Sequence, residues 1–583
     1  MAAGSGQRAA GSGQRAAGSG QRAAGSGQRA AELSVLYAVR SATALNRLLD
    51  TLPVFSGDDR VRPVFTLVPG SDFGTDALAA LDEAGARTIP WSTAVRTEHA
   101  LVVAASPNGP LRELRGPLVL LPHGAGFNKR LPDASDDDSA SGLHPRQLLR
   151  DGEPLAALHA LAHPGQLTRL ARGSRAVAAR ARVVGDPTLD RMLASRGLRE
   201  RYRDALRTGG RRLVAVVSTW GPESLMVRRP GLPARLTAEL PYDAYQVALV
   251  VHPNVHSELG AFELRRRLRP ALDAGLLLPR PYEEWAAVLT AADCVLTDHG
   301  SAALYAAALD RPLMGCYEGG TELVPASPMA GLLAHVPRLT ADAALDRQVD
   351  AAVAAYRPGD TRAVADAAFA ERDRALERLR AHCYRLLGLE PPAGAVTARP
   401  LPLPRVTGER PTALAALTEV RGTTVSVARY PLSRGPHGGH TVAEYGFSSV
   451  NETRAAGLLV RRARPATGPE PHARDAVWTA GGWTTYALEE YPGCRTAAAV
   501  LTHDHGVLRR AGHRDALSVR LAAHASPEPW VRPDPAAVLS CVHAWLEANE
   551  SPALPVSLDC LVGGRRTTVL LAYATETETH AEL

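Results

Sequence analysis

Residues 293–301 read Asp-Cys-Val-Leu-Thr-Asp-His-Gly-Ser, and an alanine-rich run continues from there to Leu309. A short apolar run passes into polar residues and then into a helix-forming segment, which predicts a strand, a turn and a helix start. The first N–H groups of such a helix have no partner within the helix and lie at the positive end of its dipole. We therefore expect this turn to bind an anion, and phosphate is the first candidate. The alternative is a plain helix cap, with Gly300 in the turn and Ser301 as the capping residue.

Length and composition indicate a globular protein with more than one domain. The chain has 583 residues, of which 45% are apolar and 22% charged, and a chain of this length is expected to fold as two or three domains. The formal net charge is +6, but four arginines belong to an N-terminal repeat and leave +2 for the remainder. We find no basic stripe on a folded segment, so no nucleic-acid partner is expected.

The cysteines and the apolar runs predict a cytoplasmic protein. The six cysteines lie far apart and include no C-x-x-C pair, which argues against a zinc ribbon and against a disulfide scaffold. The most apolar windows, near 213–218 and 286–309, are too short or are broken by Asp293 and Asp298. No transmembrane segment is therefore expected. Peripheral contact with the inner face of a membrane is left open.

Lys129 is the single lysine of a chain that has sixty-five arginines. It lies six residues after His123, in a segment that reads Leu-Pro-His-Gly-Ala-Gly-Phe-Asn-Lys-Arg over residues 121–130. A compact ammonium differs from the planar guanidinium group, so a specific role for this lysine is favoured over its chance survival in a surface loop.

The N-terminal part of the chain predicts a tail followed by a doubly wound domain. Residues 1–32 contain four copies of Ala-Ala-Gly-Ser-Gly-Gln-Arg, a composition typical of a flexible, disordered segment. From Leu33 onward, apolar runs alternate with helical patterns, which predicts parallel strands in βαβ units. The expected strands are 33–39, 61–68, 87–91, 100–104, 118–121 and 181–184. We assign residues 33–208 to one Rossmann-like domain.

A second alternation of strands and helices begins near Arg211, and we assign residues 209–390 to a second Rossmann-like domain. The expected strands are 213–218, 245–251, 276–278, 293–297 and 312–314, and one long helix is expected over 363–389. Two such domains in series are typical of the GT-B architecture of transferases, in which the site lies in the cleft between the domains. This is an analogy at the level of the fold and names no reaction.

The last part of the chain has a different character. Residues 391–411 contain six prolines and predict a linker. Residues 412–583 predict an α+β accessory domain, with strands near 425–428, 456–461, 477–483 and 569–573 and a helix over 536–547. His503 and His505 could hold a metal ion, but no third ligand is evident, so no metal site is expected.

Several expected strands end in polar groups suited to phosphate chemistry. His123 follows a strand of the first domain, whereas Thr219, His252 and the turn 298–301 follow strands of the second. The carboxyl ends of parallel strands face the same cleft, so these separate motifs are expected to become neighbours. Each histidine taken alone would be interpreted as a structural or surface residue. The expected convergence of these histidines at one cleft favours a functional site.

At these residues the sequence resembles the CDP-glycerol glycerophosphotransferases, the teichoic-acid polymerases of GT-B fold. The resemblance covers roughly residues 33–390 and departs from the family pattern at Pro122, at His299-Gly300 and after Pro187. The form Asp-His-Gly-Ser-x-x-x-Tyr also looks like a divergent actinobacterial branch. The matching motifs are His123-Gly124 with Lys129, Gly185-Asp186-Pro187, Ser218-Thr219, His252-Pro253 and Asp298-His299-Gly300-Ser301.

The resemblance implies a transferase in which an acceptor hydroxyl attacks the β-phosphorus of a CDP-linked donor, and a glycerol-phosphate-like group is moved. His123 would be the base, and Asp298 would orient a neighbouring histidine or bind donor hydroxyls. Lys129 would neutralise negative charge. The donor phosphates would be bound by Thr219, His252, His299, Gly300 and Ser301. The resemblance implies no cofactor and no metal, because that family does not rely on a metal held by protein carboxylates and this sequence shows no paired acidic ligands at these motifs.

Two other functions stay open at this point. The same fold could use a nucleotide-sugar and transfer a sugar, with His123 again as base. The chain could instead be a non-catalytic nucleotide-binding module in which residues 412–583 perform the recognition. In each catalytic case the partners are a nucleotide-linked donor and a hydroxyl acceptor, for which a lipid-linked or polymer-linked molecule is an option. The sequence contains no P-loop, H-E-x-x-H or G-x-S-x-G motif, which leaves NTPase, zincin and hydrolase functions without support.

Overall fold

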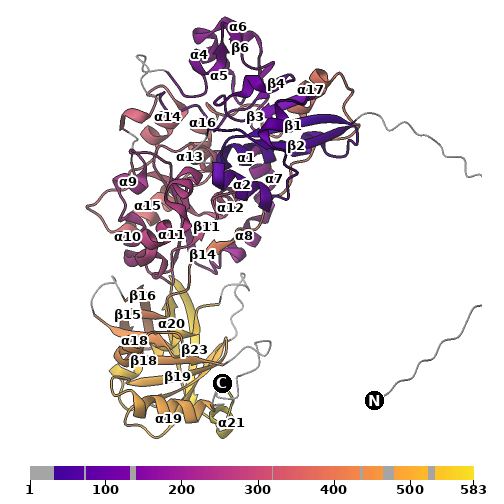
Figure 1. Ribbon diagram of the computed structural model, residues 1–583. Coiled ribbons are helices and arrows are strands. Elements are labelled where there is room, and N and C mark those ends of the chain that lie inside the picture. The colour runs from indigo at the N-terminus through magenta and orange to yellow at the C-terminus, as the bar shows by residue number, and fades with distance from the viewer. Residues whose placement is uncertain are drawn as a thin grey trace, which may run out of the picture.

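The computed structural model describes residues 32–70, 74–131, 139–317, 320–432, 438–463, 478–522 and 532–583, with no side-chain detail for residues 74–76. The N-terminal repeat lies outside these ranges. Figure 1 shows an α/β part, which contains two parallel sheets, and a strand-rich part beside it that holds the C-terminal residues.

The β1 sheet, as we call the first one, has six parallel strands in the order β2-β1-β3-β4-β7-β8. These strands are β1 (Leu33–Val39), β2 (Val61–Leu67), β3 (Leu101–Ala104), β4 (Leu118–Leu120), β7 (Leu158–Leu161) and β8 (Ala181–Val183). Most are continuous apolar runs, which suits strands covered by helices on both faces. The chain order reverses between β1 and β3, and polar residues follow β1, β3 and β4 at the same edge of the sheet. Such an edge is where α/β sheets bind ligands.

Helices cover both faces of the β1 sheet. They are α1 (Ala42–Leu49), α2 (Gly74–Glu83), α3 (Trp91–Ala94), α4 (Pro145–Leu148), α5 (Pro164–Gly173) and α6 (Arg175–Ala179), with a short hairpin of β5 (Leu149–Arg150) and β6 (Glu153–Pro154). The next two helices, α7 (Pro187–Ala194) and α8 (Arg199–Ala205), pack instead in the core of the β9 sheet described below. The expected strand 87–91 is a single bridge between Thr88 and Phe65, after which α3 begins.

The β9 sheet has four parallel strands in the order β10-β9-β12-β13. These are β9 (Arg212–Ser218), β10 (Tyr245–Val251), β12 (Cys294–Thr297) and β13 (Leu313–Gly315). Single bridges at Leu277 and Arg338 extend it in parallel on both sides. The expected parallel α/β organisation is therefore confirmed for both sheets. Because β9 lies beside β12, the turns that follow these two strands are neighbours.

The helices around the β9 sheet include one that returns to the β1 sheet. They are α9 (Leu225–Arg228), α10 (Leu232–Glu239), α11 (Pro253–Leu272), α12 (Glu284–Ala291), α13 (Ala302–Ala308), α14 (Pro328–His335), α15 (Leu345–Ala355), α16 (Asp360–Ala365) and α17 (Ala375–Leu387). The prediction of a single helix over 363–389 is wrong, because residues with positive φ, Glu371 and Asp373, separate α16 from α17. Leu376 and Tyr384 of α17 pack in the core of the β1 sheet.

The proline-rich segment 391–411, expected to be a linker, lies against the α/β part. β14 (Val406–Thr407) pairs antiparallel with β11 (Leu278–Pro279). The Leu401 amide donates to the hydroxyl of Ser195 at 3.0 Å, and the Tyr202 hydroxyl donates to the Leu401 carbonyl at 3.0 Å. We call residues 391–411 the strap.

The described residues between 413 and 573 form a closed barrel of nine strands in the order β15-β16-β22-β23-β21-β20-β19-β18-β17. The strands are β15 (Ala413–Arg421), β16 (Thr424–Pro431), β17 (His440–Glu444), β18 (Leu458–Arg462), β19 (Thr496–Thr502), β20 (His505–Arg510), β21 (Ala516–Leu521), β22 (Val556–Val562) and β23 (Arg565–Tyr573), and the helices are α18 (Val450–Ala455), α19 (Ala480–Glu490), α20 (Pro535–Ala548) and α21 (Glu576–Thr579). Helix α20 contacts β15, β16 and β22 on one side and β18 and β19 on the other, and most of its residues are buried.

Mixed strands and helices agree with the α+β expectation. The strand expected at 477–483 begins at a residue outside the described ranges, and over 478–483 the prediction is wrong, because α19 begins at Ala480 and its Trp483 is fully buried.

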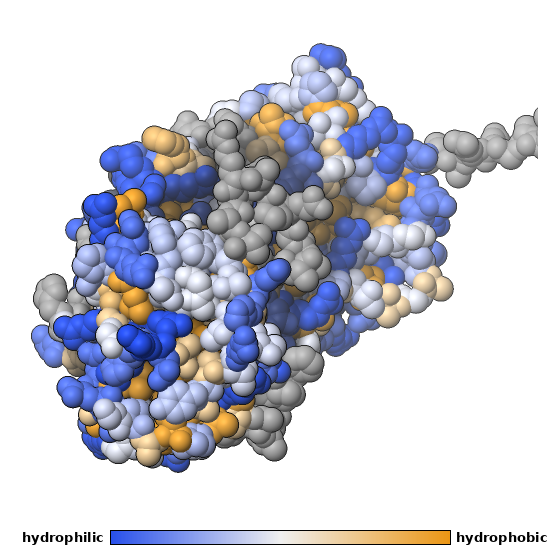
Figure 2. Space-filling view, turned by 90° about the horizontal axis from the view of Figure 1, so that it is seen from below, coloured by the Kyte–Doolittle hydropathy of each residue, from blue (hydrophilic) through white to orange (hydrophobic). Residues whose placement is uncertain are grey.

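The barrel joins the α/β part through a buried charge cluster. Arg429, 1% exposed, binds Asp243 at 2.6 Å and Asp534 at 2.7 Å, and Asp534 also binds Arg462 at 2.7 Å. The face in Figure 2 shows hydrophobic residues scattered among hydrophilic ones. Within the described residues, none of the helices combines the length and the apolar character that crossing a membrane requires.

Candidate active site

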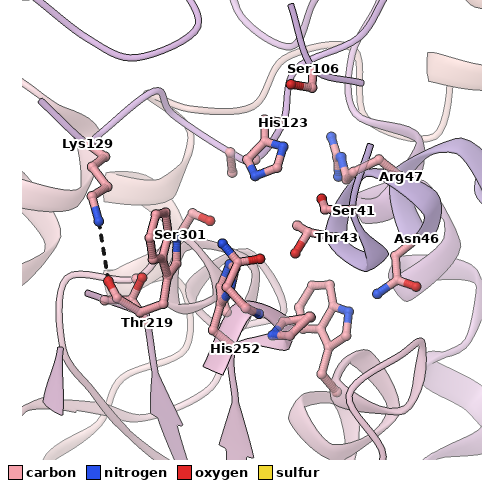
Figure 3. A pocket seen from close by; sticks show the side chains of 18 of the residues that line it. Ser41, Thr43, Asn46, Arg47, Ser106, His123, Lys129, Thr219, His252 and Ser301 are labelled. Carbon is pink, nitrogen blue, oxygen red and sulfur yellow. Dashed lines mark hydrogen bonds between the residues drawn. The ribbon is translucent and has the colours of Figure 1, made fainter. Parts of the chain in front are cut away.

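A cavity of about 430 Å³ lies between the polar edges of the β1 and β9 sheets. Residues after β1, β3 and β4 line one wall, and residues after β9, β10 and β12 line the other. Figure 3 shows side chains of both walls pointing into the same space. The structure thus brings together seven of the eight residues predicted from the sequence, namely His123, Lys129, Thr219, His252, His299, Gly300 and Ser301.

The eighth residue, Asp298, differs from the expectation that it would bind donor hydroxyls or orient a histidine. It is fully buried, and its carboxylate accepts N–H groups from Thr219 at 2.9 Å, Leu225 at 2.8 Å and Gly300 at 2.9 Å. Burial raises the pKa of Asp298, whereas nearby His299 and these N–H donors act in the opposite direction. Asp298 therefore holds the turns after β9 and β12 together beneath the cavity.

Gly300 and Ser301 fit closely in this turn. A β-carbon on Gly300 would lie 3.2 Å from the Thr219 β-carbon and 3.1 Å from an Asp298 oxygen. Ser301 is the N-cap residue of α13, but its side chain accepts no hydrogen bond from an N–H group of that helix. Across the cavity, a β-carbon on Gly124 would lie 3.0 Å from the Ser301 hydroxyl. The two walls therefore approach each other at this point, and only small residues fit.

His252 carries its proton on the nitrogen that is free to face a ligand. It flanks the start of α11, and its Nδ1 accepts the Asn254 N–H group at 3.1 Å. An acceptor nitrogen has no hydrogen, so the proton of the neutral ring is on Nε2. Burial lowers the pKa of His252 to about 3, and His123 and Lys129 add to this effect. The ring is thus a fixed neutral hydrogen-bond donor.

His123 has the opposite arrangement. Its Nδ1 lies 3.3 Å from the Ala105 carbonyl, which can only accept, so Nδ1 carries the hydrogen and Nε2 has a free lone pair. Burial lowers the pKa of His123, and the Arg47 charge lowers it further, while the bond to Ala105 raises it. The side chain is open to the cavity although protein surrounds it closely, and Figure 3 shows the ring projecting into the cavity opposite His252. This is the arrangement of a base.

Lys129 lines the cavity with its charge already paired. Its Nζ lies 2.9 Å from a Glu322 oxygen and 4.3 Å from the centre of the Trp220 ring, and it donates to the Trp220 carbonyl at 3.3 Å. The His299 Nε2 lies 3.3 Å from the same Glu322 oxygen. The loop that contains Lys129 also bonds to residues 322 and 324, so it crosses from the β1 sheet to the β9 sheet. Glu322 was missed by the sequence analysis.

Arg47 and Tyr305 also line the cavity and were not predicted. Arg47 donates to both oxygens of Asp186, at 3.1 and 2.7 Å, and to the Tyr305 hydroxyl at 2.6 Å. Burial opposes the charge of Arg47, but Asp186 and Tyr305 raise its pKa above the usual value. Asp186 belongs to the Gly-Asp-Pro motif, which was the only signal in the sequence for this contact.

Outside the cavity, the structure gives His505 a structural role. Its Nε2 lies 2.9 Å from Glu578, which also binds Arg520 at 2.6 Å. Within the described ranges, no three His, Cys, Asp or Glu side chains are arranged to hold a metal ion. His503 is exposed.

Comparisons with known proteins give structural matches only. No family model and no curated protein matches the sequence. The wall teichoic acid polymerase TagF matches with a TM-score of 0.43 and 14% identity, over 61% of this chain and 89% of that chain. HepE from Anabaena, solved in complex with UDP-glucose, matches with a TM-score of 0.37 and 14% identity, over 61% of this chain and all of that chain.

Proposed function

We propose that this protein is a transferase that moves a glycerol-phosphate-like group from a CDP-linked donor to an acceptor hydroxyl. The observation that supports this most is the opposite placement of protons on His123 and His252, which line the same cavity. One ring offers a lone pair to a hydroxyl group, and the other offers an N–H group to an anion.

In the proposed reaction the acceptor hydroxyl attacks the β-phosphorus of the donor. The hydroxyl proton passes to Nε2 of His123, and cytidine monophosphate leaves with the electron pair of the broken P–O bond. Burial lowers the pKa of His123 below its ordinary value, which favours the unprotonated ring that a base requires. His252 donates its Nε2–H to the donor diphosphate, together with Thr219 and Ser301.

The proposal divides the chain by role. Residues 33–208, which contain the β1 sheet, carry the base and receive the acceptor. Residues 209–390, which contain the β9 sheet, bind the donor, and the two segments act as the two Rossmann-like domains of a GT-B enzyme. Residues 391–411 connect these domains to the accessory domain 412–583. Lys129 neutralises charge on the donor or the acceptor. The reaction needs no cofactor, because the chain supplies the base and the anion-binding groups.

The experiment is a product analysis with two donors. The protein is incubated with CDP-glycerol or with UDP-glucose and a panel of polyol and polymer acceptors, and the released nucleotide is separated by chromatography. Release of CMP with acceptor-bound glycerol phosphate is the expected result. Release of UDP instead would assign sugar transfer, and tight CDP binding without turnover would favour a non-catalytic module.

The variant His123→Gln tests the role of the base. Turnover is expected to fall about 10²–10⁴-fold, the usual contribution of general base catalysis, while the affinity for CDP stays near that of the unmodified protein. His503→Gln, at an exposed position of the barrel, is the matched control. Equal turnover in both variants would contradict the assignment.

A further inference from the structure

The hydroxyl of Thr43 has a buried position that the fold itself does not explain. Its Oγ1 is buried and has no hydrogen-bond partner among the residues that the structure describes, and the residue lines the cavity. Figure 3 shows Thr43 beside Ser41 on the cavity wall formed by the start of α1. Leaving a buried hydroxyl unpaired destabilises a fold, so a group in this position indicates a ligand that pairs with it.

Thr43 lies in the first turn of α1, and this helix start is open to the cavity. Ser41 caps the helix by accepting the Ala44 N–H group at 3.2 Å, so the Thr43 hydroxyl is not needed as a cap. One turn further, Asn46 is 8% exposed and also lines the cavity. The first N–H groups of a helix have no partner within it and lie at the positive end of its dipole. The start of α1 thus offers donors to an anion.

The start of α1 is held rigidly against both halves of the site. Arg47, on the same helix, binds Asp186 and the Tyr305 hydroxyl of α13, and all three side chains are buried. The Asn46 side-chain amide donates to the Tyr282 carbonyl at 3.0 Å, next to α12. Donors that are fixed in advance stabilise developing charge without reorganisation.

We propose that Thr43 and the first N–H groups of α1 bind the non-bridging oxygens of the phosphoryl group during its transfer. This inference rests on the proposed function and adds a further catalytic residue to it. The acceptor oxygen forms a bond to the β-phosphorus, and the bond from that phosphorus to the bridging oxygen breaks. The electron pair leaves with the nucleoside monophosphate, and the acceptor proton passes to His123. The Thr43 hydroxyl donates to the oxygens that carry charge throughout.

Thr43→Val tests this role because it removes the hydroxyl and keeps the shape. Turnover of CDP-glycerol is expected to fall about 10²-fold, as for the loss of one oxyanion donor, and calorimetric binding of inorganic pyrophosphate is expected to weaken at least about 10-fold. The thermal midpoint is expected to stay equal or to rise, because an unpaired buried hydroxyl is removed. Thr43→Ser keeps the hydroxyl and is expected to retain binding.

Thr51→Val is the matched control. Thr51 lies at the other end of α1, is 2% exposed, and donates to the Leu48 carbonyl at 2.7 Å. Its replacement is expected to lower the thermal midpoint and to leave pyrophosphate binding unchanged, the opposite pattern from Thr43→Val.

The outcomes separate the inference from the proposed function. If the unmodified protein binds no pyrophosphate, or if Thr43→Val binds it equally well, the inference is overturned. If pyrophosphate binding depends on the Thr43 hydroxyl but CDP-glycerol is not turned over, the oxyanion site stands and the proposed donor fails. If CDP-glycerol is turned over equally by Thr43→Val, the proposed function stands and the inference fails.

Discussion

His252 couples the stability of the fold to pH. An unperturbed histidine has a pKa near 6.5, whereas burial lowers the pKa of His252 in the fold to about 3. Between these values the unfolded chain binds one proton more than the folded chain. Stability contributed by His252 is therefore present above about pH 6.5 and is lost as the pH falls toward 3, at up to about 1.4 kcal/mol per pH unit.

The variant His252→Asn isolates this contribution, because asparagine can still cap α11 but does not titrate in this range. We expect its free energy of unfolding, measured with urea between pH 7 and pH 4, to decline less steeply than that of the unmodified protein. His503→Asn, at an exposed position, should follow the unmodified protein. Three parallel curves would contradict the assignment.

Gly300 is the residue at which a single added methyl group should disturb the turn after β12. The β-carbon of Gly300→Ala would press on Thr219 and Asp298, and hydrogen bonds fix both neighbours. Overpacking of this kind costs about 1–3 kcal/mol, so we expect CDP affinity in a calorimetric titration to fall about 10-fold or more. Gly197→Ala meets nothing within 4 Å and should bind normally. Unchanged CDP affinity in Gly300→Ala would contradict this prediction and would show that the turn can shift to make room for the methyl group.

The sequence predicted which residues meet in the cavity but not how each one is held. Strand ends predicted the meeting of His123 with His252, because the carboxyl ends of parallel strands share an edge. The full burial of Asp298 and the pairing of Lys129 with Glu322 depend on segments far apart in the sequence. Thr43 was overlooked because a threonine in a first helical turn is normally interpreted as local structure.

At the scale of elements, continuous apolar runs predicted most strands of the α/β part, and the helix expected over 536–547 matches α20 within one residue at each end. The bounds of β1 and β10 match the prediction residue for residue, whereas β7 was missed because His159 interrupts its apolar run. The break between α16 and α17 has a tertiary cause. Phe369 lies in the core of the β9 sheet and Leu376 in that of the β1 sheet, so the chain must turn between them.

The strap gives a prediction at this scale. Ser195 is fully buried, accepts the Leu401 N–H group at 3.0 Å and donates to the Arg191 carbonyl at 2.8 Å. Ser195→Ala would leave the Leu401 N–H group unpaired, which costs about 1–3 kcal/mol. We expect faster cleavage of the strap in limited proteolysis. Ser56→Ala, which removes an exposed 3.4 Å contact, is the control, and equal cleavage of both variants would show that the strap is held elsewhere.

At the scale of the whole molecule, the closed barrel could not be predicted from local pattern. Its order depends on parallel pairs between distant segments, such as β16 with β22, and the burial of α20 depends on strands from both sides of the barrel. Its attachment to the α/β part depends equally on long-range contacts, because Asp243 lies in the α/β part and Arg429 and Asp534 in the barrel.

This attachment leads to a prediction about cooperativity. Arg429→Ala would leave Asp243 buried without the Arg429 cation and would leave Asp534 with Arg462, and breaking a buried ion pair in this way costs about 3–5 kcal/mol. Because the lost contacts join the two parts, we expect calorimetric unfolding to separate into two transitions, with the barrel unfolding first. Arg421→Ala removes an exposed pair with Glu419 on the same hairpin, and it should change stability by at most about 1 kcal/mol. A single transition in Arg429→Ala, shifted no more than in Arg421→Ala, would show that the barrel is held by its apolar contacts alone.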